Sequence, residues 1–179
     1  MIYFTSDLHL GHANVIRYSK RPFANVDEMN TALIKNWNAT VTAEDDVYLL
    51  GDLAFMGTQR ALAMLGGLKG RKHLIFGNHD YARRNQYAAS GLFEWCKDLA
   101  EIEVSGQLIF LCHYPMVTWH RSHHGSWNLH GHCHGDLPPD RQARRQDVGV
   151  DVWDYAPVSF ERLAIEMATR AFKPVDHHE

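Results

Sequence analysis

Three short apolar runs in the first half of the chain each end in residues that bind metals. Residues 2–5 lead to Asp7-Leu8-His9, residues 46–50 to Gly51-Asp52, and residues 72–76 to Gly77-Asn78-His79-Asp80. Apolar runs without strict alternation are typical of strands that are covered on both faces. Since parallel strands of an α/β fold end at one edge of the sheet, these polar groups are expected to meet at a single site.

The segments between these runs have the spacing of helices. Residues 29–37 carry apolar side chains at four-residue steps after a cap at Asn25 or Asp27, and the apolar run at 61–65 ends at Gly66. Caps of this kind mark the beginning of a helix, and glycine commonly marks its end. The pattern of apolar runs and helical segments in the first half of the chain therefore predicts βαβ units.

The second half has antiparallel signals. Residues 101–104 and 108–112 flank Ser105-Gly106-Gln107, which predicts a tight hairpin, and a last helix is expected after Ser159. Residues 114–128 and 135–146 are rich in Pro, Gly, His and Arg without periodicity, which predicts loops.

Two further segments add imidazole groups. His113 follows the apolar run at 108–112, and Gly131-His132-Cys133-His134 comes later. On a strand, the Asp-x-His and His-x-His spacings would direct both polar side chains to one face and turn Cys133 to the other. Carboxylate, carboxamide and imidazole groups from five segments suit two divalent cations about 3.5–4 Å apart, an arrangement that splits phosphate esters.

Each segment has a simpler interpretation when taken alone. An isolated Gly-Asp is more often a turn or a helix cap, and Asn and Asp together are common in turns. The functional interpretation therefore depends on the five segments occurring together and in this order.

The bulk composition is that of one globular domain. With 179 residues, 45% of them hydrophobic and 22% charged, the chain fits a single domain over 1–179 and is neither disordered nor fibrous. Lys and Arg number 18 against 21 Asp and Glu, so no overall basic field supports binding to extended nucleic acid. The 13 histidines fit a metal-binding protein.

The sequence also sets expectations for cellular location. Cys96, Cys112 and Cys133 show no Cys-x-x-Cys spacing and are interpreted as free thiols in a reducing compartment. The apolar strand expected at Ile2 leaves no room for a signal peptide, and no apolar run approaches the ~20 residues of a membrane span. We therefore expect a cytoplasmic protein without a membrane partner; a homo-oligomer is compatible with the sequence.

The ordered set Asp-x-His, Gly-Asp, Gly-Asn-His-Asp, His and Gly-His-x-His resembles the signature of the calcineurin-like metallophosphoesterase superfamily. The chain is similar to its compact, stand-alone bacterial and phage members. The motifs cover Tyr3 to His134, and residues 147–155 are similar less specifically. The resemblance implies an α/β fold, a four-layer α/β/β/α sandwich of two mixed sheets flanked by helices.

The resemblance also implies a role for each motif residue. One metal ion would be held by Asp7, His9, Asp52 and His134, and the other by Asp52, Asn78, His113 and His132. A hydroxide bridging the metals would attack phosphorus, His79 would assist the leaving oxygen, and Asp80 would orient the ring of His79. Mixed oxygen and nitrogen ligands suit Mn best, with Fe, Ni or Zn as alternatives.

Two departures from relatives bear on the substrate. The third residue after Asp52 is Phe55 where many relatives have an acidic residue, and Asp80 replaces the glutamate that is usual in protein phosphatases. Both departures argue against a protein substrate. We expect a phosphodiesterase acting on small nucleotides or nucleic-acid ends. The alternatives are a phosphomonoesterase of small metabolites and, from another class, a catalytically inactive binding scaffold that keeps the fold.

Several residues outside the ligand set are candidates for contact with the substrate, each with a structural role as the simpler alternative. The candidates are His12, Arg17, His120 and His130, with Trp119 and Trp127 as residues that could stack a base. Arginines such as Arg21 are expected to be solvated at the surface. His177 and His178 are expected to have no catalytic role.

Overall fold

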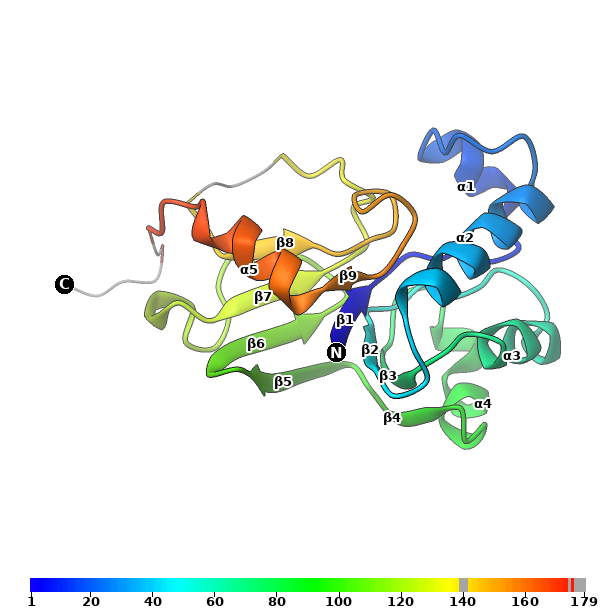
Figure 1. Ribbon diagram of the computed structural model, residues 1–179, viewed down its shortest axis with the longest axis horizontal. Helices are drawn as coiled ribbons and strands as arrows, with labels where there is room; N and C mark the ends of the chain where they lie inside the picture. The colour runs from blue at the N-terminus through cyan, green and yellow to red at the C-terminus, as the bar shows by residue number, and fades with distance from the viewer. Residues whose placement is uncertain (139–141, 174, 176–179) are drawn as a thin grey trace.

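The computed structural model describes residues 1–138, 142–173 and 175 (Figure 1); His177 and His178 lie outside the described residues. The elements in chain order are β1 (Ile2–Thr5), α1 (Ala13–Tyr18), α2 (Val26–Thr40), β2 (Asp46–Leu49), α3 (Thr58–Gly66), β3 (Arg71–Ile75), η1 (Tyr81–Arg83), α4 (Arg84–Ala89), β4 (Phe93–Lys97), β5 (Leu99–Val104), β6 (Gln107–Cys112), η2 (Ser122–His124), β7 (Trp127–His130), β8 (Arg145–Asp147), β9 (Val158–Ser159) and α5 (Phe160–Ala168). No helix within these ranges is both long and apolar enough to cross a membrane.

The first sheet has the strand order β4-β3-β2-β1-β9. Strands β1 to β4 are parallel neighbours, and β9 is antiparallel to β1. Helices α2 and α3 connect the parallel strands, and the side chain of Asn25 caps α2 by accepting from the backbone N–H groups of Asp27 and Glu28. The predicted βαβ organisation and the cap at Asn25 are confirmed.

The second sheet has the order β5-β6-β7-β8. Strands β5 and β6 form the predicted hairpin, closed by Ser105 and Gly106 at φ angles of 50° and 80°, which suit a tight two-residue turn. Strands β7 and β8 continue the sheet in parallel with β6. The prediction of loops over 114–128 and 135–146 is wrong at the ends of both segments. The strands β7 and β8 are short, β8 is polar, and the strands with which they pair are distant in sequence.

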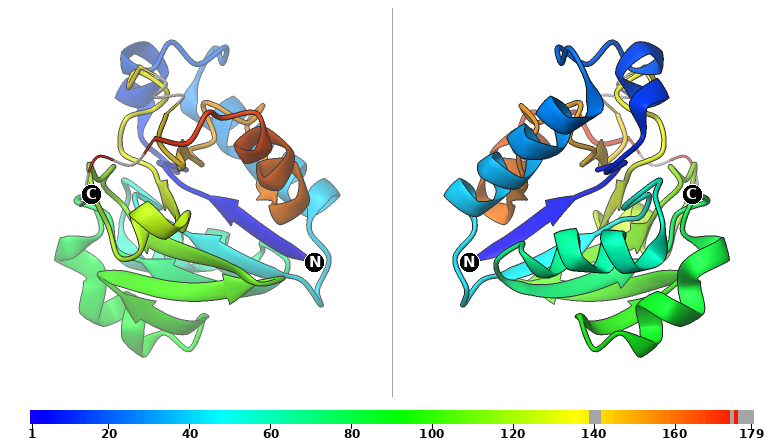
Figure 2. Two further views of the ribbon diagram at one scale, coloured as in Figure 1. Left: turned by 90° about the vertical axis from the view of Figure 1, so that its left-hand side faces the viewer. Right: turned by 90° about the vertical axis from the view of Figure 1, so that its right-hand side faces the viewer.

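The two sheets pack face to face, and helices cover the sandwich (Figures 1 and 2). Phe4, Leu50 and Ile75 of the first sheet share a core with Ile109 and Leu129 of the second. The other face of the first sheet packs against α2 and α3 in a separate core. The α/β fold with two mixed sheets flanked by helices is thereby confirmed; the extent of one domain over 1–179 stays a prediction.

The outer face of the second sheet is covered by the segment at 113–126. Trp119 in this segment packs against Phe110 and Cys112, and its indole N–H donates to the carbonyl and hydroxyl oxygens of Ser126. Trp127 is also buried, and its ring stacks on Phe160 of α5. Both tryptophans therefore anchor the fold. This structural role is the alternative to stacking a substrate base that the sequence left open.

Candidate metal centre

The chain segments that follow β1 and β2 stay side by side beyond the sheet. The backbone N–H groups of Asp7, His9 and Leu10 donate to the carbonyl oxygens of Gly51, Asp52 and Leu53, each over 3.0 Å. Ser6 also pairs with Gly149, which follows β8 in the second sheet. The ends of the two sheets therefore meet where the sequence motifs occur.

Five candidate ligands have left-handed backbone conformations. The φ angles are 57° at Asp7, 49° at His9, 57° at Asp52, 71° at His132 and 49° at His134. The expectation that the Asp-x-His and His-x-His pairs share a strand face is wrong, since β1 ends at Thr5 and β7 ends at His130. The left-handed backbone at these residues redirects their side chains. Strained backbone of this kind at residues other than glycine is concentrated at functional sites.

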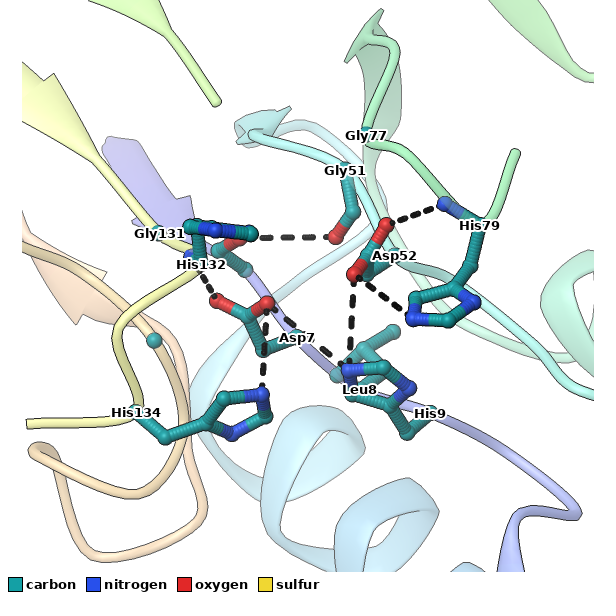
Figure 3. A network of polar contacts seen from close by, with 12 residues as sticks. Asp7, Leu8, His9, Gly51, Asp52, Gly77, His79, Gly131, His132 and His134 are labelled. Carbon is teal, nitrogen blue, oxygen red and sulfur yellow. Dashed lines mark hydrogen bonds and ion pairs between the residues drawn. The ribbon is translucent and has the colours of Figure 1, made fainter. Parts of the chain in front are cut away.

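Asp7 is fully buried and joins the two halves of the site (Figure 3). Its Oδ2 accepts a hydrogen bond of 2.9 Å from the backbone N–H of His132. Its Oδ1 makes no hydrogen bond and lies 3.8 Å from the Nε2 atoms of both His9 and His134. This arrangement leaves a buried carboxylate oxygen facing two imidazole nitrogens.

Asp52 lies between the two groups of ligands. Its Oδ2 is 3.6 Å from His9 Nε2 and 3.6 Å from His113 Nε2. Its Oδ1 accepts a 2.9 Å hydrogen bond from the backbone N–H of His79, which fixes the orientation of the carboxylate (Figure 3). One oxygen of Asp52 is thus equally close to an imidazole on either side.

Asn78 brings two further imidazoles together. Its Oδ1 lies 3.1 Å from His113 Nε2 and 3.0 Å from His132 Nδ1. The other ring nitrogen of His113 donates to the carbonyl oxygen of Leu50 over 2.6 Å. That hydrogen bond selects the tautomer of His113 whose Nε2 has a free lone pair for a cation.

The donor atoms fit bound cations. Ligands that hold one ion at about 2.0–2.2 Å lie about 3.0–3.6 Å from one another, close to the separations observed here. Within the described residues, the ligand atoms of Asp7, His9 and His134, and those of Asp7, Asp52 and His113, lie within 4.8 Å of one another. Asp7 Oδ1 and His9 Nε2 are buried without a hydrogen-bond partner, and a cation would satisfy both.

Burial sets the protonation of the two central ligands in the absence of a cation. It raises the pKa of Asp7 to about 7 and lowers the pKa of His9 to about 2. His9 is therefore neutral at physiological pH, as metal ligation requires. With a pKa near neutrality, the carboxyl of Asp7 is partly protonated at physiological pH, and a bound cation would replace that proton.

Two glycines allow the chain to approach the carboxylates closely. A Cβ atom at Gly77 would lie 2.2 Å from Asp52 Oδ1, and one at Gly131 would lie 2.3 Å from Asp7 Oδ2. No side chain fits at either position without displacing a candidate ligand. The glycines of the Gly-Asn-His-Asp and Gly-His-x-His motifs thus serve close packing at the site.

The expectation that Asp80 orients the ring of His79 is wrong. Asp80 is buried, and its carboxylate accepts from the backbone N–H groups of Asp52, Leu53 and Gly77 over 2.8, 3.1 and 2.9 Å. Asp80 therefore positions the segment that carries Asp52. Sequence spacing could not reveal this because the acceptor geometry depends on the fold of both segments.

Arg21 and Asp151 support the site, and sequence reasoning assigned a role to neither. Both oxygens of Asp151 accept 2.8 Å hydrogen bonds from Arg21, and Oδ2 also accepts from His134 Nδ1 over 2.7 Å. Arg21 is only 4% exposed and also donates to the carbonyl oxygens of Asp7 and Leu8. The expectation of a solvated Arg21 is therefore wrong.

The Asp151 contact also affects the charge of His134. Burial by itself lowers the pKa of His134, but the hydrogen bond to Asp151 and the charge of Asp7 raise it above the ordinary value. In reverse, burial raises the pKa of Asp151, while His134 and Arg21 bring it below its usual value. Asp151 orients His134 through Nδ1 and leaves Nε2 directed at Asp7.

A hollow of about 540 Å³ opens beside these ligands. His79 borders it with a half-exposed ring, whose Nε2 lies 3.9 Å from Asp52 Oδ2. The lining residues are His9, His12, Asn14, Val15, Tyr18, Ser19, Phe55, His79, His132, Cys133, His134 and Asp136. Cys133 thus borders the hollow, and the strand alternation that was expected to turn it away does not apply.

The four candidate substrate contacts lie in different surroundings. His12 lines the hollow, with Nδ1 3.3 Å from His9 Nδ1. Arg17 is exposed over the ring of Tyr18, and His120 pairs with Glu101. His130 is buried and borders a separate cavity with Arg145 and Asp147. The structure brings only His12 of these four to the hollow, and its contact with substrate stays a prediction.

Replacing Asp7 by Asn tests the buried carboxylate in the metal-free protein. Between pH 4 and 7 the native state binds the Asp7 proton and the unfolded state does not, so wild-type stability falls as pH rises through this window. We expect the variant to match the wild type near pH 4 and to exceed it above pH 7, by up to about 4 kcal/mol.

The measurement is denaturant unfolding of both proteins across this pH range after chelation. Glu44→Gln, at an exposed position, is the control and should show no pH-dependent difference. Added Mn should stabilise the wild type more than Asp7→Asn, because the variant keeps only the second set of candidate ligands intact. A difference independent of pH would contradict the raised pKa of Asp7.

A double-mutant cycle tests the Arg21–Asp151 pair. Arg21→Met leaves the buried carboxylate of Asp151 without its partner, which costs about 3–5 kcal/mol of unfolding free energy. Arg21→Met combined with Asp151→Asn should cost less than the sum of the single changes, because the second change removes the uncompensated charge. Additive losses in denaturant unfolding would show that the two residues do not act as a pair.

The chain aligns over most of its length with known proteins, and the alignments also cover most of those proteins. It is 38% identical over 169 residues to the uncharacterized protein MJ1445 of Methanocaldococcus jannaschii, covering 90% of this chain and 88% of that one. It is 32% identical over 180 residues to the Gene 66 protein of Mycobacterium phage L5, covering 84% and 86%. No model of a known protein family matches the chain.

Among solved structures, a protein of unknown function from Aquifex aeolicus, AQ665, has a TM-score of 0.75 at 25% identity, covering 93% of this chain and 98% of that one. YfcE, a phosphoesterase from E. coli, has a TM-score of 0.47 at 14% identity, covering 83% and 77%, a likeness too distant to bear on function. By sequence identity over nearly its whole length, the chain belongs to the family of MJ1445 and the phage Gene 66 proteins.

Proposed function

We propose that the protein is a two-metal phosphoesterase of the calcineurin-like type. The observation that carries the proposal is the position of Asp52 Oδ2, 3.6 Å from an imidazole nitrogen of each ligand group. A single oxygen shared in this way suits a carboxylate that bridges two cations. Asp7, His9 and His134 would complete one cation site with Asp52, and Asn78, His113 and His132 the other.

The donor set supports divalent cations with open positions. Two carboxylates, an amide oxygen and four imidazoles differ from the Cys-rich sets of closed structural zinc sites. Mn is the preferred ion in this proposal, with Fe, Ni or Zn as alternatives. Bound cations supply activation of water and neutralisation of phosphoryl charge in sites of this kind.

His79 is the residue proposed to serve the leaving group. Hydrolysis forms a bond from a water oxygen to phosphorus and breaks a P–O ester bond, so the departing oxygen needs a proton. The ring of His79 borders the hollow beside Asp52 and makes no hydrogen bond to Asp80 within the described residues. It is therefore free to donate a proton to a substrate oxygen.

The substrate class proposed is a phosphodiester of a small nucleotide or a nucleic-acid end. The hollow beside the ligands is open on one side and has a volume of about 540 Å³, which leaves room for an organic group beyond the phosphate. A diester places such groups on two sides of phosphorus. The overall charge of −3 agrees with a small substrate better than with an extended nucleic acid.

Metal removal and Asp52→Asn test the shared carboxylate. Chelation should abolish hydrolysis of a model phosphodiester, and Mn should restore it with about two ions per chain at saturation. Asp52→Asn should lose activity more severely than His9→Ala, because Asp52, unlike His9, lies close to imidazoles of both ligand groups. Turnover and metal content are measured together, with Glu44→Gln as the control; full activity after exhaustive chelation would contradict the proposal.

His79→Gln tests the role at the leaving group. The variant should keep both cations and lose about 10²–10⁴ in turnover on an alkyl ester, with a much smaller loss on a nitrophenyl ester whose leaving group needs no proton. Asp80→Asn should instead reduce metal content, since a carboxamide has one acceptor oxygen for three backbone N–H groups. Equal losses of His79→Gln on both esters would assign His79 to phosphoryl binding.

A further inference from the structure

Three aromatic side chains form an exposed shelf at the edge of the hollow. This aromatic shelf consists of His12, Tyr18 and Phe55. The rings of His12 and Phe55 stack with centroids 4.3 Å apart and planes 20° from parallel, and Tyr18 meets His12 edge-on at 6.4 Å. Phe55 is 49% exposed and Tyr18 is 62% exposed. Large aromatic groups left together in water at a hollow indicate a binding surface.

The shelf is held in place by the backbone. The N–H of Phe55 donates to the carbonyl of Leu10 over 2.8 Å, next to the pairing of Leu10 with Ala54. Gly11 is so close to the neighbouring segment that a Cβ atom there would lie 2.5 Å from the Met56 side chain. The aromatic shelf is therefore a preformed surface, which reduces the entropy lost when a ligand binds.

The aromatic shelf lies on the His79 side of the centre. The ring of Phe55 is 5.7 Å from that of His79 and edge-on to it, and the ring of His12 is 6.2 Å from it. Another exposed aromatic residue, Tyr114, lies instead beside His113 and His132, with ring centroids 5.1 and 4.8 Å apart. If His79 donates a proton to the leaving oxygen, the aromatic shelf would contact the organic group attached to that oxygen.

We propose that the aromatic shelf binds a nucleobase of the leaving group, so that preferred substrates release a base-bearing alcohol. This inference rests on the proposed function. A flat aromatic face accepts any base by stacking. Asn14 and Ser19 line the same hollow and offer hydrogen-bond donors and acceptors to a base edge.

The direction of bond cleavage is the first test. The metal-loaded full chain is given adenosine 5′-(methyl phosphate), a diester whose two leaving alcohols have similar acidity. We expect adenosine and methyl phosphate as products, because the base occupies the shelf beside His79. Adenosine monophosphate and methanol would overturn the inference and assign the base to the opposite side of the centre.

Variants of the shelf provide the second test. Phe55→Leu keeps apolar bulk and removes the aromatic face, and Ile165→Ala removes an exposed apolar side chain on α5 as the control. With the adenosine diester, Phe55→Leu should raise KM about tenfold with little change in kcat, as expected for one lost base stack. With ribose 5-(methyl phosphate), which has no base, the rise in KM should be much smaller. Equal effects on both substrates would overturn the assignment to the base.

A binding measurement separates this inference from the proposed function. Adenosine and ribose, neither of which carries a phosphate, are titrated into the metal-free full chain and followed by NMR. We expect adenosine to change the chemical shifts, with a dissociation constant about tenfold higher in Phe55→Leu than in the wild type. Ribose should change no chemical shifts. Absence of hydrolysis of every phosphate ester would overturn the proposed function, whereas equal binding of adenosine and ribose would overturn the shelf inference.

Discussion

The hydrogen bond from the backbone of His132 to the carboxylate of Asp7 holds the two sheets together at the site. Asp7 follows β1 of the first sheet, and His132 follows β7 of the second. The bond uses one oxygen of a fully buried carboxylate and directs the other at His9 and His134. A buried charge of this kind destabilises the fold unless a proton or a cation compensates it. The packed sheets therefore bury a carboxylate at their edge, and this carboxylate favours the binding of a proton or a cation.

The surroundings of this carboxylate explain how the strained backbone is retained. A left-handed conformation at a residue other than glycine costs about 1–3 kcal/mol. At Asp7 and His9 it is opposed by backbone hydrogen bonds to the segment at 51–53 and by the guanidinium of Arg21, which binds the carbonyl oxygen of Asp7. The same interactions direct the ligand side chains, so stability and site geometry depend on the same residues.

The two groups of ligands differ in their exposure. Asp7, His9 and Asp52 are buried, and His134 is oriented by Asp151. In the second group His113 is buried, whereas Asn78 and His132 are exposed at the surface of the site. Because a rigid, desolvated set of ligands loses less entropy on binding, a buried cation position beside an open one is the arrangement that this geometry supports. Under the proposed function, the exposed position is the one that a substrate phosphate would reach from solvent.

The sequence by itself determined which residues are candidate metal ligands and which strands precede them. Apolar runs and helical spacing predicted the parallel strands, the helices between them and the hairpin at 101–112, since these features depend on local patterning. The identities of the candidate ligands followed from residue types that prefer cations. None of this required knowledge of distances.

Only the tertiary structure decided how these residues are supported. Arg21 and Asp151 are 130 positions apart, so no local pattern could pair them. Asp80 binds backbone N–H groups of a segment 27 and 28 positions away, which reverses the role expected from its place beside His79. Strand β7 is too short, and strand β8 too short and polar, to be recognised without the strands with which they pair. Side-chain identity is a property of the sequence, whereas burial, backbone strain and hydrogen bonding across the sheets arise only when distant segments pack together.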